Sequence, residues 1–251
     1  MDKKVSIVIP IHNAEAFILD TVACVKAQTY EDWELLLVEN GSTDSTLEIL
    51  ESYIRRNPDE RMRLFSIDGK CAAAGRNFGV DQSKGRYLSY LDADDIWEKD
   101  KLEKQVQFMQ QKNAAFSFTG YEFADENGVG LGKIVRVPET LSYRQALQNT
   151  TIFTSTVMFD TEKIPRSMLQ MPLIKSEDTA LWWKLLRNGE TAYGLDENLV
   201  KYRRSKGTLS SNKLEAMRRI WNLYRKEEKL SLPYSVCNFF FWALRAVKRR
   251  V

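Results

Sequence analysis

Three carboxylate side chains stand within four residues of the chain, directly after an apolar run. They are Asp92, Asp94 and Asp95, in the segment Tyr90-Leu91-Asp92-Ala93-Asp94-Asp95. Carboxylates this close repel one another unless protons or a cation neutralise them. Their oxygens suit Mg²⁺ or Mn²⁺, and such a metal would bridge diphosphate oxygens and stabilise charge on a leaving group. Taken alone, an equally good interpretation is that Asp94 or Asp95 caps a helix after Trp97.

Three further sites carry polar groups that suit chemistry. Glu39, at the start of Glu39-Asn40-Gly41-Ser42-Thr43-Asp44, can accept hydrogen bonds from a base or a ribose; the alternative is a loop with a helix cap. Asp178, next to Glu177, suits a general base; the alternative is a pair of acids at a helix start. Arg76 suits a phosphate contact; the alternative is a solvated helix arginine. For each of these three sites taken alone, the structural alternative is favoured over the functional interpretation.

Several other chemistries find no support in the chain. His12 is the only histidine, and no serine-elbow motif accompanies it, so a Ser-His-Asp triad and histidine-based zinc chemistry are both unsupported. No GxGxxG follows the first apolar run and no GxxxxGK[ST] occurs. Nicotinamide-type dinucleotide binding and P-loop hydrolysis are therefore weak interpretations.

The elements that must position these residues alternate along the first hundred positions. Buried strands are predicted over 5–9, where Pro10 ends the run, and over 33–38, 63–67 and 86–91. Helices are predicted over 14–27 and over 72–82, although Gly75 and Gly79 weaken the pattern of the second. A further helix is predicted to start at the capping box formed by Ser45 and Glu48. This alternation predicts an α/β fold with a mostly parallel central sheet flanked by helices. Ligands of such sheets bind beyond the carboxyl ends of the strands, where the polar clusters stand.

After Asp95 the alternation becomes less regular. Helices are predicted over 102–111 and 179–187, and strands over 115–123, 134–137, 156–159 and 199–202. Two helical stretches, beginning at Asn212 and Pro233, end the chain. We therefore expect one α/β domain over residues 1–211 and a helical C-terminal extension over residues 212–251.

Composition indicates a soluble globular protein of a reducing compartment. The chain has 251 residues and three widely spaced cysteines, Cys24, Cys71 and Cys237, which argue against a disulfide framework. Its start lacks the apolar region of a signal peptide, and no run reaches the roughly 18–20 apolar residues of a spanning helix. We expect a cytoplasmic protein, peripheral on the inner face of the cytoplasmic membrane if its tail binds lipid.

The C-terminal extension carries the positive charge of the chain. Residues 212–251 contain ten basic and three acidic side chains, whereas the rest has a net charge of −4. Residues 233–251 are aromatic and then basic, a pattern that suits an anionic membrane surface. The alternative is a helix packed on the body with a solvated end. We expect no nucleic-acid partner.

Taken together and in order, these segments resemble the inverting family 2 glycosyltransferases with the GT-A fold. The similarity covers about the first 210 residues. It rests on the opening strand with Pro10 and Asn13, on Val38 to Asp44, on Ala74-Gly75-Arg76-Asn77-Phe78-Gly79, on the Asp-x-Asp segment at Asp92, on Glu177-Asp178 before Trp182, and on Tyr202-Arg203. Any one motif is weak, but the ordered set is specific.

The resemblance implies roles for individual residues. Asp92 and Asp94 would hold Mn²⁺ or Mg²⁺ and the donor diphosphate, and Asp178 would be the base that deprotonates the acceptor hydroxyl. The donor would be a nucleoside-diphosphate sugar, with a UDP-sugar favoured. The residues expected to bind this nucleotide sugar are Pro10, Ile11, Asn13, Glu39, Arg76, Asp92, Ala93 and Asp94. Bacterial members of this layout extend saccharides that are often lipid-linked, in capsule, O-antigen, lipopolysaccharide or cell-wall polymer synthesis.

Two positions depart from the family pattern. Glu39-Asn40 stands where an Asp pair is usual, which bears on the preferred base of the donor. Ser205 stands where a His is frequent, so the metal would have one ligand fewer.

Two rival functions are a nucleotidyltransferase and a catalytically inactive sugar-nucleotide-binding module. The first would need a Gly/Arg/Lys-rich loop that Ile11-His12-Asn13-Ala14 does not provide, and the intact Asp92, Asp94 and Asp178 argue against the second.

Overall fold

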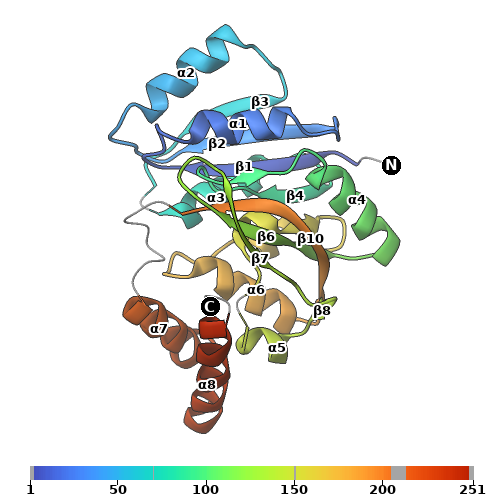
Figure 1. The fold of residues 1–251 in the computed structure, drawn as a ribbon, viewed down its shortest axis with the longest axis vertical. Helices are drawn as coiled ribbons and strands as arrows, with labels where there is room; N and C mark the ends of the chain where they lie inside the picture. The colour runs from blue at the N-terminus through green and yellow to red at the C-terminus, as the bar shows by residue number, and fades with distance from the viewer. Residues whose placement is uncertain (1–2, 70, 150, 205–212, 249–251) are drawn as a thin grey trace.

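Apolar and amphipathic runs alternate along the chain and form a ten-stranded sheet with helices on both faces (Figure 1). The structure, a computed structural model, describes residues 3–69, 71–149, 151–204 and 213–248. The elements up to the acidic run are β1 (Val5–Ile11), α1 (Ile18–Lys26), β2 (Trp33–Glu39), α2 (Thr46–Arg56), β3 (Met62–Ser66), α3 (Ala72–Gln82) and β4 (Tyr87–Tyr90). Those after it are β5 (Ile96–Trp97), α4 (Lys101–Lys112), β6 (Phe116–Ala124), β7 (Gly130–Val135), β8 (Thr140–Leu141), α5 (Tyr143–Leu147), β9 (Met158–Asp160), α6 (Glu177–Arg187), β10 (Ala192–Arg203), α7 (Lys213–Asn222) and α8 (Leu232–Lys248).

The predicted α/β class is confirmed, and the sheet divides into a parallel and a mixed half. Its strand order is β3-β2-β1-β4-β9-β6-β10-β5, with β7 beside β6 and β8 beside β10. Neighbouring strands from β3 to β4 are all parallel, as expected. Beyond β4, the strand β9 runs antiparallel to both of its neighbours, and among the described strands only β6 and β10 pair in parallel. The parallel half therefore contains the predicted ligand-binding edge.

The first strand continues past Pro10, contrary to the prediction that Pro10 ends it. Parallel pairing with β2 extends to Ile11 opposite Glu39. The Val8 carbonyl accepts a hydrogen bond from the Leu91 amide on the β4 side, and the Ile11 carbonyl accepts one from the Asn40 amide on the β2 side. Because the backbone groups of successive strand residues point to alternate sides, those of Pro10 point toward β4. Pairing with β4 has ended there, at Val8. Proline is tolerated because its missing N–H has no ladder partner to lose.

Alternate residues of the strands face two separate cores. In β1, Ile7 and Ile9 pack with α1, α2 and α4, whereas Val8 packs on the opposite face with α3 and α6. Gly79 of α3 is required for this second contact, since a Cβ there would lie 2.2 Å from Val8 Cγ1. The glycines that weaken the helix pattern thus let α3 lie close against the sheet.

Two helix starts and one helix cap differ from the predicted ones. Ser45 forms no capping box; the Thr46 amide instead donates to the Asp44 carboxylate at 3.1 Å, which satisfies the first turn of α2. The helix α1 starts at Ile18 rather than at position 14. The helix α6 starts at Glu177, two residues earlier than predicted, so Glu177 and Asp178 both lie in its first turn.

Lys101, at the start of α4, is fully buried beneath the sheet. Its Nζ donates to Ser89 Oγ at 3.0 Å and lies 3.5 Å from the centroid of the Trp97 ring. Burial holds the pKa of Lys101 well below its usual range, because a charged ammonium is poorly solvated there. Folding therefore disfavours the charged form that the unfolded chain prefers.

We predict that Lys101→Met stabilises the protein and removes part of the pH dependence of its stability. With the lowered pKa, the native state binds fewer protons than the unfolded state just below pH ~10, so wild-type stability includes a contribution that rises with pH there. That contribution amounts to at most about 1.4 kcal/mol per pH unit. Denaturant unfolding at pH 8 and pH 9.5 would measure it.

Lys99 is exposed, and Lys99→Met is the matched control for Lys101→Met. Its free energy of unfolding should equal that of the wild type at both pH values. A Lys101→Met variant that is less stable than the wild type at pH 8, or that keeps the wild-type difference between the two pH values, would contradict the assignment.

The helices α7 and α8 pack against each other at the end of the molecule opposite to α1 and α2 (Figure 1). Trp221 of α7 lies edge-on to Phe239 of α8, with ring centroids 5.6 Å apart. The pair joins the body through Tyr224, whose ring stacks on Trp183 of α6 at 5.2 Å. Among the described residues, no helix combines the length and the apolar character needed to cross a bilayer.

Candidate active site

The predicted clusters meet at the carboxyl edge of the parallel strands. Ile11 ends β1 beside Glu39, which ends β2, and β4 ends just before the acidic run. Asn13 joins the loops that follow β1 and β2: its Oδ1 accepts from the Thr43 amide at 2.8 Å and its own amide donates to Ser42 Oγ at 3.0 Å. The Asn13 backbone is left-handed, with φ of 50°, which asparagine tolerates better than most residues.

Glu39 is buried at this edge and held by hydrogen bonds. The Ser42 amide donates to its Oε1, and Ser66 Oγ donates to its Oε2 at 3.1 Å. Burial raises the pKa of Glu39, but the hydrogen bonds from Ser42 and Ser66 outweigh burial, so the net pKa is lowered. Glu39 is therefore a fixed carboxylate acceptor, and its contact with a base or ribose stays a prediction.

Arg76 is the central cation of the site, and it is only 5% exposed. Its Nη2 pairs with Asp92 Oδ1 at 2.6 Å, and its Nη1 pairs with Glu177 Oε1 at 2.8 Å. The charge of Asp178 also acts on Arg76. Despite burial, these carboxylates raise the pKa of Arg76 above its ordinary value. One arginine thus connects the acidic run after β4 to the start of α6, and the solvated-arginine alternative is wrong.

The other two members of the acidic run have different surroundings. Asp94 is half-buried and forms no ion pair within the described part of the chain. Burial, together with the negative charge of Asp92, raises its pKa to about 6. Asp95 is fully buried, and its carboxylate accepts from Ser155 Oγ and from the Arg203 amide. Asp95 does not cap a helix, because the next helix starts only at Lys101.

A short turn at Thr154–Thr156 links the acidic run after β4 to the acids at the start of α6. The sequence gives no signal for this link. Ser155 Oγ donates to Asp95 and accepts from the Asp92 amide at 3.1 Å. Next to it, Thr154 Oγ1 donates to Asp178 Oδ2 at 3.1 Å. The other Asp178 oxygen accepts from the Thr179 amide at 2.6 Å. Neighbouring hydroxyls therefore fix the acidic run and Asp178 relative to each other.

We predict that Ser155→Ala destabilises the protein by about 1–3 kcal/mol, because it leaves the buried Asp95 carboxylate short of a donor. The same change leaves the Asp92 amide without this acceptor. Denaturant unfolding would measure the loss of stability. The control is Ser52→Ala on α2, whose hydroxyl makes no hydrogen bond to the described residues. Equal behaviour of the two variants would contradict the role of Ser155.

The remaining predicted residues lie in the frame of the site. Pro10, Ile11 and Ala93 are buried at the strand ends, and the Ala93 carbonyl accepts from Thr21 Oγ1 at 2.9 Å. Arg203, in the predicted closing strand, pairs with Asp20 at 3.2 Å. Ser205 lies outside the described residues. No group of three or more His, Cys, Asp or Glu side chains placed to hold a metal occurs in the described ranges.

The chain matches a known family over most of the parallel half of the sheet. Residues 6–163, from β1 through β9, match the model of glycosyl transferase family 2. This span covers the loop residue Asn13, Glu39, Arg76 and the whole acidic run. It ends before α6, so Asp178 lies outside the matched segment. The match gives no support to a nucleotidyltransferase.

Two curated relatives align over nearly their whole length. TuaG of Bacillus subtilis (strain 168), named as a glycosyltransferase of teichuronic acid biosynthesis, is 41% identical over 249 residues, which are 98% of this chain and 97% of TuaG. WfgD of Escherichia coli is 33% identical over 243 residues, 95% of this chain and 92% of WfgD. WfgD is named a UDP-Glc:α-D-GlcNAc-diphosphoundecaprenol β-1,3-glucosyltransferase.

Solved structures of two other proteins share the fold. TarS of S. aureus (residues 1–349) in complex with UDP-GlcNAc is 21% identical with a TM-score of 0.69, and the match covers 89% of this chain and 67% of TarS. The mannosyltransferase PcManGT of Pyrobaculum calidifontis, in complex with GDP-Man and Mn²⁺, is 16% identical with a TM-score of 0.72, over 96% of this chain and 69% of its own. The expected GT-A fold is therefore confirmed, and the chain belongs to glycosyl transferase family 2, as a glycosyltransferase of the surface-polysaccharide type.

Proposed function

We propose that this enzyme moves a sugar from a nucleoside-diphosphate sugar, with UDP favoured, to a hydroxyl of a lipid-linked saccharide, with inversion at the anomeric carbon. The observation that carries the proposal is the pairing of Arg76 with both Asp92 and Glu177. This pairing brings a diphosphate-binding segment and a candidate base to one edge of the sheet. Inversion requires the base and the leaving group to lie on opposite sides of the sugar. The start of α6 would supply the base, and the acidic run would bind the leaving diphosphate.

The donor side of the site suits a divalent cation. Asp92 and Asp94 offer carboxylate oxygens two residues apart, and Arg76 engages Oδ1 of Asp92. The Asp94 carboxylate, partly buried beside another negative charge, gains from a nearby cation. Mn²⁺ or Mg²⁺ bound there would neutralise the diphosphate as it leaves. Two protein ligands suffice, because such metals keep waters and take phosphate oxygens as further ligands.

The acceptor side supplies the base. Asp178 is half-buried in the first turn of α6, and Thr154 and Thr179 orient its two oxygens. Its carboxylate takes the proton of the acceptor hydroxyl, whose oxygen then bonds to the anomeric carbon as the bond to the diphosphate breaks. Glu177 cannot serve as readily, because its Oε1 is committed to Arg76.

A transfer assay tests this function directly. The purified enzyme is given UDP-sugars, Mn²⁺ and a saccharide linked through diphosphate to a polyprenol, the acceptor class named for WfgD. We expect a product extended by one sugar whose anomeric configuration is opposite to that of the donor. A product of retained configuration would refute the single displacement. Absence of transfer from every nucleotide sugar supplied would refute the function.

We further propose that α8 holds the enzyme on an anionic membrane surface. Its outer face carries exposed apolar side chains at four-residue spacing, whereas Trp242 on the inner face is buried. These exposed side chains are Leu232, Val236, Phe240 and Leu244. An apolar helical stripe of this kind inserts among lipid headgroups. Residues 249–251, which end the predicted basic segment, lie outside the described residues.

We predict that replacing Phe240 and Phe241 by Ser lowers binding to anionic vesicles at least tenfold. The two rings are 58% and 41% exposed, so they have apolar area to bury in a membrane, at about 25 cal/mol per Å². Co-sedimentation with phosphatidylglycerol vesicles measures the effect. Val129→Ser with Leu131→Ser removes comparably exposed apolar side chains from β7 and the residue before it, and serves as control. If both pairs of substitutions reduce binding equally, α8 is not the attachment surface.

A further inference from the structure

A groove separate from the donor site runs between α7 and the segment that precedes α6. Its volume is about 800 Å³. Ile174 and Lys175 form one wall; α7, from Leu214 to Asn222, and the following turn as far as Glu227 form the other. Lys175 lies two residues before Glu177 in the chain, so this wall leads directly into the first turn of α6. The groove is therefore joined through the chain to the first turn of α6, which carries the proposed base Asp178.

The lining of the groove is positively charged. It contains four basic and two acidic side chains. One of these acids, Glu215, is already paired with Lys175 at 2.6 Å. Arg218 and Lys226, in contrast, form no ion pair with any residue that the structure describes. They stand eight residues apart, about two helical turns, and are exposed on the groove side of α7 and the turn that follows it. The charge of Arg218 acts on Glu215, but two cations without an ion pair along one wall still suit a ligand with two adjacent negative groups.

The rim of the groove includes an apolar side chain. Leu214, in the lining, is 78% exposed, and Leu173, which precedes the lining residue Ile174 in the chain, is 70% exposed. Exposed leucines near cations suit an amphiphile better than a free phosphate, because the apolar part of the ligand covers them. The groove is also built on α7, which packs against α8 through Trp221 and Phe239. The helix proposed to rest on the membrane therefore supports it.

From this arrangement we infer that the groove binds the diphosphate of a prenyl-diphosphate-linked acceptor, with the start of the prenyl chain against Leu214 and Leu173. The inference rests on the proposed function and adds the place where the lipid carrier is recognised. Arg218 and Lys226 bind the diphosphate, and the saccharide extends from there toward Asp178. The enzyme would then recognise its acceptor partly by the carrier and not only by the sugar.

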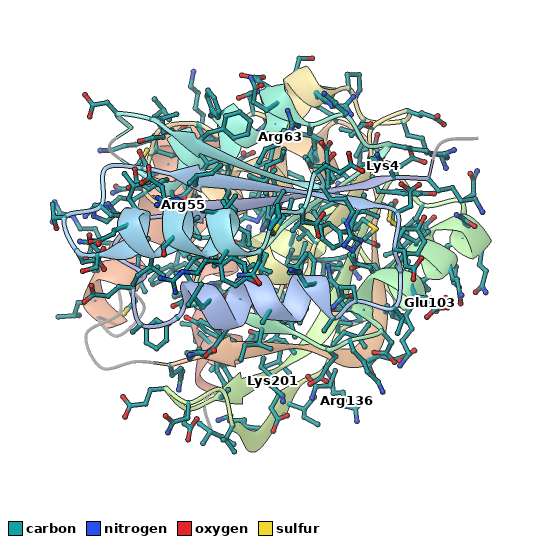
Figure 2. All side chains as sticks on the ribbon, turned by 90° about the horizontal axis from the view of Figure 1, so that it is seen from above. Lys4, Arg55, Arg63, Glu103, Arg136 and Lys201 are labelled. Atoms are coloured by element: carbon teal, nitrogen blue, oxygen red, sulfur yellow. The ribbon has the colours of Figure 1, made fainter. Side chains whose placement is uncertain are left out.

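Direct binding tests the groove without requiring transfer. Farnesyl diphosphate, a water-soluble short prenyl diphosphate, is titrated calorimetrically into the enzyme with Mn²⁺ and saturating UDP, so that the donor site is filled. We expect binding that weakens at least about tenfold in Arg218→Ala with Lys226→Ala, since each change removes a charge-assisted contact. Arg55→Ala with Lys84→Ala is the matched control: both side chains are exposed, and Arg55 lies on α2 (Figure 2), at the end of the molecule opposite to α7 (Figure 1). It should bind as the wild type does.

Three results would overturn the inference. They are no binding of farnesyl diphosphate by the UDP-saturated wild type, equal weakening in both double variants, and inorganic pyrophosphate binding as tightly as farnesyl diphosphate. The last would show that the apolar rim contributes nothing. A failure of the transfer assay alone refutes the proposed function, whereas normal transfer without farnesyl diphosphate binding refutes only the groove.

Discussion

Replacing Asp178 by Asn should lower the rate of sugar transfer by about 10²–10⁴-fold while leaving donor binding unchanged. The amide has the shape of the carboxylate but cannot take a proton from the acceptor hydroxyl. Its oxygen can still accept from the Thr179 amide, and its NH₂ can donate to Thr154 Oγ1. The first turn of α6 therefore keeps its geometry, and the loss is confined to the chemical step.

The measurement for Asp178→Asn pairs steady-state transfer with calorimetric titration of the UDP-sugar. Asp81→Asn is the control, because Asp81 also accepts a hydrogen bond from a neutral side chain, that of Gln170, but is exposed and forms no ion pair with the described residues. Transfer at more than about a tenth of the wild-type rate would remove Asp178 as the base. A parallel loss of donor affinity would assign it to binding instead.

Replacing Asp94 by Asn should abolish the Mn²⁺-dependent part of donor binding. Groups that merely orient metal ligands contribute 10–100-fold to affinity or activity, so loss of a direct ligand should cost about a hundredfold or more. Titration of the UDP-sugar with Mn²⁺ and with EDTA measures the difference. Unchanged dependence on Mn²⁺ in the variant would refute the assignment of Asp94 as a ligand.

The same substitution should stabilise the metal-free protein. Burial and the charge of Asp92 already raise the pKa of Asp94 to about 6, so its ionised form is less favourable in the native state than in the unfolded chain. This cost to stability is fully present above about pH 6 and is lost as the pH falls from there to the unfolded pKa near 3.9. Asp94→Asn removes the cost at neutral pH. Lower stability of metal-free Asp94→Asn at pH 7 would contradict this account.

Much of the fold follows from local patterns. The helix over 72–82 has the predicted bounds, and the strands of the parallel half lie within a few residues of their predicted positions. Periods of 2.0 and 3.6 residues reflect which faces of a strand or helix are buried, and one segment is enough to show them. The carboxyl ends of parallel strands share one edge, so the gathering of Asn13, Glu39 and Asp92 could also be predicted.

The sequence by itself thus determined the elements, the edge of the sheet and the residue types available there. Only the tertiary structure decided which of them meet: Arg76 lies 16 residues from Asp92 and 101 from Glu177 along the chain, yet pairs with both. Ser155, which holds Asp95, and the buried Lys101 had no local signal either. Such contacts depend on how β9 and α6 return to the sheet, and that is set by packing of whole faces against each other, which no single segment encodes.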